Sequence, residues 1–150
     1  MCYAKGNLDL VPSHKKAARL YQRAADLGNV MAMTSLGIAY DKGRGVKLDQ
    51  KKAFKYWRMA ADQGMADAQF NLGGCFYHGN GVAQDYAEAM RFFKLAADQG
   101  YTQAECSLGV MYTSGEGVDR DFAEAARWYE RAAAKGNETA KCALARIKTL

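Results

Sequence analysis

Residues 68–100, AQFNLGGCFYHGNGVAQDYAEAMRFFKLAADQG, contain one complete copy of a unit that recurs on both sides of this stretch. Leu72 and Gly73 coincide with Leu36 and Gly37 after a shift of 36 residues in one direction, and with Leu108 and Gly109 after the same shift in the other. Four further glycines keep the same period: Gly28, Gly64, Gly100 and Gly136. A fixed period of this size, without insertions, indicates a stacked-repeat architecture.

The composition is that of a folded chain without a membrane span. Among 150 residues, 49% are hydrophobic and only one is proline, which argues against disorder. No apolar run is long enough to cross a bilayer, and the first residues lack the apolar centre of a signal peptide. In a repeat array the core is shared between neighbouring units, so we expect each unit to depend on the next for stability.

The net charge of +5 predicts solvated helix faces rather than a site for nucleic acid. Lysines and arginines occur in every copy and are interleaved with acidic residues, whereas a nucleic-acid footprint is a concentrated basic patch. We therefore expect no nucleic-acid partner.

Each unit reads as two helices, and no segment has strand periodicity. The first helices are expected at Val30–Lys42, Ala66–His78 and Thr102–Ser114, and the second at Gln50–Gln63, Tyr86–Gln99 and Phe122–Lys135. Half-units add helices at His14–Leu27 and from Glu138 to about Lys148. The glycine after each leucine lies inside a helix and costs about 1 kcal/mol relative to alanine. Its recurrence at one register predicts the close approach of another helix.

Loops of the form GxGV join the two helices of each unit. Asp49, Asp85 and Asp121 follow these loops and are expected to be N-caps of the second helices. The spacing of Asp85 and Glu88 also fits a capping box. Gly64 and its equivalents are expected to end the second helices as C-cap glycines.

This pattern resembles the Sel-like repeat family, which is related to tetratricopeptide repeats. The resemblance is carried by Ala32, Leu36, Gly37, Tyr40, Gly43, Gly45, Val46, Asp49, Ala53, Trp57, Ala60, Ala61 and Gly64, and by their equivalents in the two later copies. It divides one repeat domain, residues 1–150, into a half repeat (1–28), full repeats (29–64, 65–100 and 101–136) and a C-terminal capping helix (137–150).

The resemblance implies an all-α fold, an α/α superhelical solenoid of helix-loop-helix repeats of about 36 residues. It also implies a protein–protein interaction module or adaptor that binds a peptide or protein in the concave groove lined by the first helices. One alternative is a weak β-lactam-binding or hydrolysing enzyme, like cysteine-rich family members. Another is a structural spacer within a longer repeat protein.

The cysteines favour free thiols. Cys2, Cys75, Cys106 and Cys142 form no close pair that would suggest a zinc site. The resemblance implies that cysteine-rich members link the second helix of one unit to the first helix of the next by a disulfide. The matching positions here, such as Ala97 and Glu105, are not cysteines. Free thiols and the lack of a signal peptide favour the cytoplasm, with a periplasmic fragment as the alternative.

We expect no enzymatic activity, no catalytic residue, no metal site and no cofactor. His78 follows Cys75 by three residues, but a Cys–His nucleophilic pair also needs an orienting group and a pocket. The GxGV loops lack the lysine and hydroxyl residues of phosphate-binding loops, so their recurrence favours structural turns.

The candidate partner-binding residues lie on the first helices, off the stripe that faces the core. They are Thr34, Ile38, Asp41, Asp67, Phe70, Tyr77, Cys106 and Val110. Apolar and aromatic residues on such a face indicate a binding patch, although packing against the neighbouring unit is an equally good explanation for Phe70. Leu20 and Tyr21 of the first half-unit lack an upstream cover, which predicts end-to-end self-association.

Overall fold

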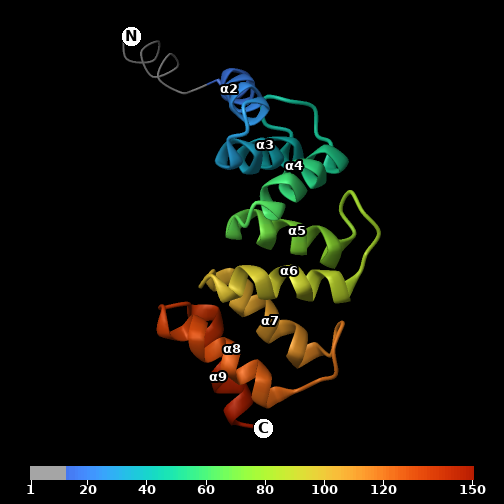
Figure 1. Ribbon diagram of the computed structural model, residues 1–150. Coiled ribbons are helices and arrows are strands. Elements are labelled where there is room, and N and C mark those ends of the chain that lie inside the picture. The colour runs from blue at the N-terminus through green and yellow to red at the C-terminus, as the bar shows by residue number, and fades with distance from the viewer. Residues whose placement is uncertain (1–12) are drawn as a thin grey trace, which may run out of the picture.

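The computed structural model describes residues 13–150, and all of the regular structure there is helical, with no strand. The helices are α2 (His14–Asp26), α3 (Val30–Lys42), α4 (Gln50–Asp62), α5 (Ala66–His78), α6 (Tyr86–Asp98), α7 (Thr102–Ser114), α8 (Phe122–Ala134) and α9 (Glu138–Lys148). Figure 1 shows them stacked in chain order, with the three GxGV loops along one edge. The expected all-α superhelical solenoid is confirmed. Cys2 and the start of the first half-unit lie outside the described residues.

The first helix of each full repeat has the bounds expected from the sequence, whereas each second helix ends one residue earlier than expected. The end of α4 shows the reason. Gln63 leaves the helical conformation as the C-cap, and Gly64 follows with a φ of +88°, which favours glycine. The amide of Gly64 then donates to the carbonyl of Ala61 at 2.9 Å and closes the turn.

The aspartate N-caps are confirmed, but the capping box is not. The side chain of Asp85 accepts a hydrogen bond from the amide of Glu88 at 3.1 Å. In a capping box, the Glu88 carboxylate would bond back to the amide of Asp85. That amide donates instead to the carbonyl of Phe76 on α5 at 2.8 Å, and Glu88 pairs with Arg91 at 2.9 Å. The loop is thus fastened to the preceding helix at the point where the box would have formed.

The glycine after each leucine lies directly under an aromatic ring of the second helix. A methyl group on Gly73 would lie 2.7 Å from the ring of Phe93, and one on Gly109 would lie 2.6 Å from the ring of Tyr129. Trp57 occupies the same place over Gly37, and its indole N–H donates to the carbonyl of Thr34 at 3.1 Å. The expected close approach of a second helix at this register is therefore present in all three full repeats.

A polar pair joins the two helices of one repeat and also contacts the last residue of the repeat before it, and the sequence interpretation missed it. Gln99 donates to the side chain of Gln69 at 2.8 Å and to the carbonyl of Gly64 at 2.9 Å. One repeat later the equivalent pair is ionic, because Lys135 lies 2.7 Å from a carboxylate oxygen of Glu105 and donates to the carbonyl of Gly100 at 2.7 Å.

Glu105 is fully buried, and its other oxygen lies 3.3 Å from the guanidinium of Arg131. A buried carboxylate is stable only when it is paired. Glu105 therefore ties α7 to Arg131 in α8 and to Lys135, the residue that ends this helix.

The adjacent glycines of α5 give a matched test of this packing. We expect Gly73→Ala to lower the free energy of unfolding by about 1–3 kcal/mol, because the new methyl overlaps the ring of Phe93. Gly74→Ala should raise it by up to about 1 kcal/mol, because nothing lies within 4 Å of the new methyl and alanine favours a helix. Urea unfolding of the two variants and the wild type measures both changes. Equal effects at the two positions would contradict the close approach at Gly73.

Candidate functional site

A cavity of about 200 Å³ opens between α5, α6 and α7. Its lining is apolar and aromatic, with a few polar groups: Phe70, Gly74, Tyr77, His78, Phe93, Ser107 and Val110. We call it the α5–α7 pocket. It brings together three of the residues predicted to bind a partner, namely Phe70, Tyr77 and Val110. An engineered cavity of about 150 Å³ is large enough to hold benzene, so this one has room for one bulky apolar side chain.

The pocket exists because Gly74 has no side chain. The same register position holds Ile38 in the preceding repeat and Val110 in the following one. A methyl group on Gly74 would meet no atom within 4 Å, so the space above it is open. A glycine inside a helix lowers its stability, and the packing does not require this one. The site is therefore a local exception to the repeat pattern.

Three aromatic residues, Phe70, Tyr77 and Phe93, form the wall of the pocket. Phe93 is buried and covers Gly73, so it is fixed in place. Phe70 packs against Phe93 with ring centroids 5.6 Å apart and against Tyr101 at 5.1 Å. Phe70 is half-buried, so its ring both contributes to the packing between repeats and faces the pocket. The sequence interpretation connected neither Phe93 nor Ser107 with the site.

Tyr77 is held by the loop of the next repeat. Its hydroxyl donates to the carboxylate of Glu116 at 2.9 Å. Burial, with a contribution from Glu116, raises the pKa of Tyr77 to about 12, so the hydroxyl stays protonated at neutral pH. The Tyr77 ring also lies 5.2 Å from that of Tyr86 and 4.9 Å from the imidazole of His78. These contacts fix the ring on one side of the pocket.

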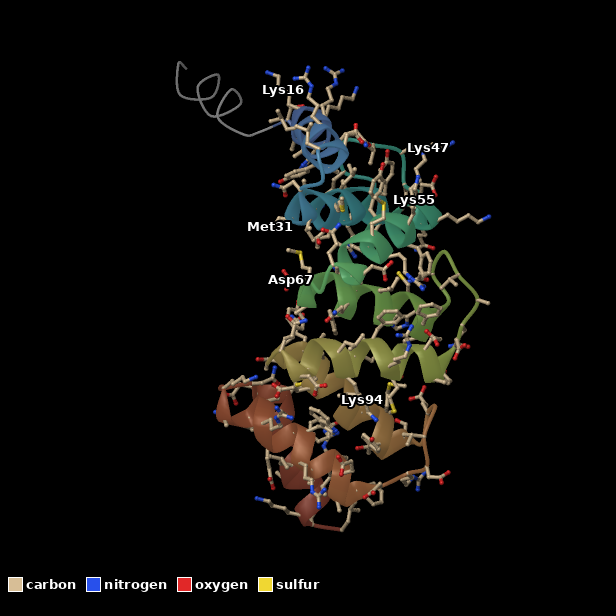
Figure 2. All side chains as sticks on the ribbon, viewed as in Figure 1. Lys16, Met31, Lys47, Lys55, Asp67 and Lys94 are labelled. Carbon is tan, nitrogen blue, oxygen red and sulfur yellow. The ribbon has the colours of Figure 1, made fainter. Side chains whose placement is uncertain are left out.

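The other predicted site residues lie outside the pocket. Thr34 is buried and its hydroxyl donates to the carbonyl of Val30 at 3.2 Å, so it does not face solvent. Ile38 is exposed and Asp41 is half-buried, one repeat earlier on α3. Asp67 is exposed in the first turn of α5, as Figure 2 shows, and Cys106 is half-buried on α7.

The polar groups near the pocket are not arranged for nucleophilic catalysis. Cys75 is buried, and this burial, with a contribution from Asp41, raises the pKa of its thiol to about 12. A nucleophilic cysteine needs the opposite shift. Ser107 donates to the carbonyl of Gln103 at 3.0 Å, and no hydrogen bond joins it to His78 in the described structure.

Within residues 13–150, no group of three or more histidine, cysteine or acidic side chains is placed to hold a metal ion. None of the helices described is both long and apolar enough to cross a membrane. The lining of the pocket is thus mainly apolar and aromatic.

Comparison with protein families gives one match, repeated along the chain. The model of the Sel1 repeat matches residues 1–29, 30–65, 66–101 and 102–137. No curated protein matches this sequence.

Solved structures of related proteins share the fold. The chain is 37% identical to c5321, described as a protective antigen present in uropathogenic Escherichia coli strains, with a TM-score of 0.87 over 89% of this chain and 28% of that one. It is also 37% identical to a Sel1 repeat protein from Oxalobacter formigenes, with a TM-score of 0.84 over 93% of this chain and 57% of that one. The chain thus spans only part of each of these two relatives.

A more distant structure supports the fold alone. Cysteine rich protein B of Helicobacter pylori is 24% identical and has a TM-score of 0.67, over 85% of this chain and 91% of that one.

The three described cysteines, Cys75, Cys106 and Cys142, are free thiols. We expect Cys142, which is exposed, to react rapidly with a thiol reagent in the folded protein. Cys75 should stay unmodified in the folded protein because it is buried and protonated. After denaturation without reductant, all four cysteines of the chain should react. Mass spectrometry of the labelled peptides measures this order, and rapid native labelling of Cys75 would contradict it.

Proposed function

Because the chain belongs to the Sel1 repeat family, we propose that it binds a peptide or protein partner through the α5–α7 pocket. Proteins of this family are generally non-catalytic scaffolds for protein interactions. In this proposal α3, α5 and α7 line the concave face of the solenoid. A bulky apolar side chain of the partner enters the pocket, and the chain acts as an adaptor rather than as an enzyme.

The open space at Gly74 is the observation that carries this proposal. A partner binds to such a pocket by filling it with one anchor side chain, while polar groups at the rim set the orientation of the bound segment. Phe93 and Phe70 supply the apolar wall. The hydroxyl of Tyr77 is already bonded to Glu116, which keeps the ring in position before a partner arrives. Preorganisation of this kind lowers the entropic cost of binding.

The contacts also suggest which side chains fit. None of the residues that line the pocket is an acid or a basic lysine or arginine. An apolar anchor such as leucine, methionine or phenylalanine loses no hydrogen bond on entering, whereas a charged one loses its hydration without gaining an ion pair. The partner segment is therefore expected to present one large uncharged side chain, flanked by residues that lie along α3, α5 and α7. Ile38, Asp41, Asp67, Cys106 and Val110 remain candidates for these flanking contacts.

Selection from a random peptide library against the purified chain tests the proposal. We expect the selected peptides to share a bulky apolar residue. Gly74→Ile, which introduces the residue found at Ile38, should weaken their binding about tenfold or more, as loss of a central anchor does. Fluorescence anisotropy measures the affinity. Leu95→Ala is the control, because it removes an exposed apolar side chain of α6 that does not line the pocket.

Thermal unfolding separates blocked binding from a damaged fold. Isoleucine has a higher helix propensity than glycine, so Gly74→Ile should melt at or above the temperature of the wild type. Selected peptides that bind the folded Gly74→Ile variant as tightly as the wild type would rule out the pocket as the anchor site.

A further inference from the structure

The basic residues of the chain are concentrated in its N-terminal part, in contrast to the even spread that we expected. Residues 13–64 contain 11 lysines and arginines and four acidic residues, whereas residues 65–150 contain nine and 11. The excess positive charge of the chain therefore lies on α2, α3, α4 and the loop between α3 and α4. A strong asymmetry of charge along a chain indicates a charged partner.

Comparison of equivalent positions shows where this charge arises. Three positions run from a base in the α3–α4 repeat to an acid in the α7–α8 repeat: Arg44, Asn80 and Glu116; Lys47, Ala83 and Asp119; Lys52, Glu88 and Glu124. The repeat fold tolerates either sign at each of them. The bases in the α3–α4 repeat are therefore not required by the scaffold.

Because position 52 holds a lysine, α4 lacks an ion pair that the equivalent positions of α6 and α8 form. In α6 and α8 the acid at this position pairs with an arginine one turn later, as Glu124 does with Arg127 at 3.1 Å. In α4 the equivalent positions hold Lys52 and Lys55, two like charges on one helix face, which is mildly destabilising. Neither lysine is in an ion pair with a described residue. Their ammonium groups lie over the rings of Tyr40 and Tyr56, at 5.2 and 5.9 Å from the ring centroids.

A cavity of about 400 Å³ lies at this edge of the repeat. It is lined by Tyr40, Val46, Lys47, Leu48, Asp49 and Lys52. Leu48 is 57% exposed, so an apolar side chain lies on the surface among the lysines. The one acid of the lining, Asp49, already accepts a hydrogen bond from the amide of Lys52 as the N-cap. Figure 2 shows Lys47 and Lys55 on the same side of the stack.

We propose that this surface, formed by Lys47, Leu48, Lys51, Lys52 and Lys55 and called here the basic α4 edge, binds an acidic protein segment that also carries apolar side chains. Carboxylates of the segment would pair with the lysines and relieve the repulsion between Lys52 and Lys55. An apolar side chain would cover Leu48 and Val46. Complementary charge of this kind speeds association and fixes the register of the bound segment.

The geometry favours an acidic peptide over a nucleic acid. Single-stranded nucleic acids bind by stacking bases on free aromatic faces. Here Tyr40 and Tyr56 stack on each other, with centroids 5.9 Å apart and planes 5° apart, and lysines lie over their rings. A phosphate backbone would not bury the exposed side chain of Leu48, whereas an apolar side chain of a peptide would.

The basic α4 edge shares no residue with the α5–α7 pocket. Binding at one surface therefore does not require the other. An adaptor with two separate surfaces can hold two segments together, whether they belong to one partner or to two.

A fluorescein-labelled peptide of alternating glutamate and leucine is the probe, used with the full chain. Lys52→Glu should weaken its binding about tenfold or more, because the variant places the acid of Glu88 and Glu124 in the middle of the edge. Lys94→Glu makes the same change in net charge on α6, where it introduces the residue found at the equivalent position of α8, Glu130. It should leave the affinity within about twofold. Binding to the wild type should also weaken as salt rises from about 0.01 to about 0.15 M, since the Debye length falls from about 30 to about 8 Å.

Further measurements decide between the possible partners and show whether each variant is folded. Lys52→Glu should melt at or above the wild-type temperature, because it creates an acid–lysine pair with Lys55 on the helix. Gly74→Ile should bind the probe like the wild type, so failure of the pocket proposal is distinguishable from failure of this one. Equal losses in Lys52→Glu and Lys94→Glu, or tighter binding of oligothymidylate or phosphatidylserine vesicles than of the peptide, would overturn the proposal.

Discussion

Contact between a bare backbone and an aromatic ring sets the distance between the two helices of every full repeat. Gly73 lies under Phe93, and a side chain as small as a methyl group would overlap the ring. The same contact, made by Gly109 with Tyr129, fixes the next repeat. Because the second helix is held this close, the backbone amide of its cap aspartate reaches a carbonyl of the first helix, as Asp85 does with Phe76. The same contact fixes the ring of Phe93, which forms part of the wall of the α5–α7 pocket.

Much of the fold was predictable from the sequence because its determinants are local. The N-cap at Asp85 and the helix-ending Gly64 depend on residues within a few positions of each other, and the structure agrees with both. The capping box failed because the choice between Glu88 and the carbonyl of Phe76 as partner of one amide is made by tertiary packing. Burial of Glu105 was missed for the same reason: its partners are a full helix away in the chain.

The candidate site shows the same division. The helix face that carries Phe70, Tyr77 and Val110 was evident from spacing, but the cavity that joins them depends on Phe93 and on an absent side chain at position 74. The sequence alone does not distinguish a helical glycine that is covered by a ring from one that is open to solvent. Gly73 and Gly74 are adjacent and have opposite surroundings. Comparison of position 74 with Ile38 and Val110 was the one signal available in the sequence.

Methyl and aromatic NMR spectra of the wild-type chain, titrated with a peptide selected on it, test the central claim most directly. The claim is that the space above Gly74 receives an apolar side chain of the partner. The account predicts that the largest shift changes fall on the methyl groups of Val110 and the rings of Tyr77 and Phe70, with little change at Leu20 or Ile147. Shift changes confined to α2 or α9, with Val110 and Tyr77 unmoved, would contradict it.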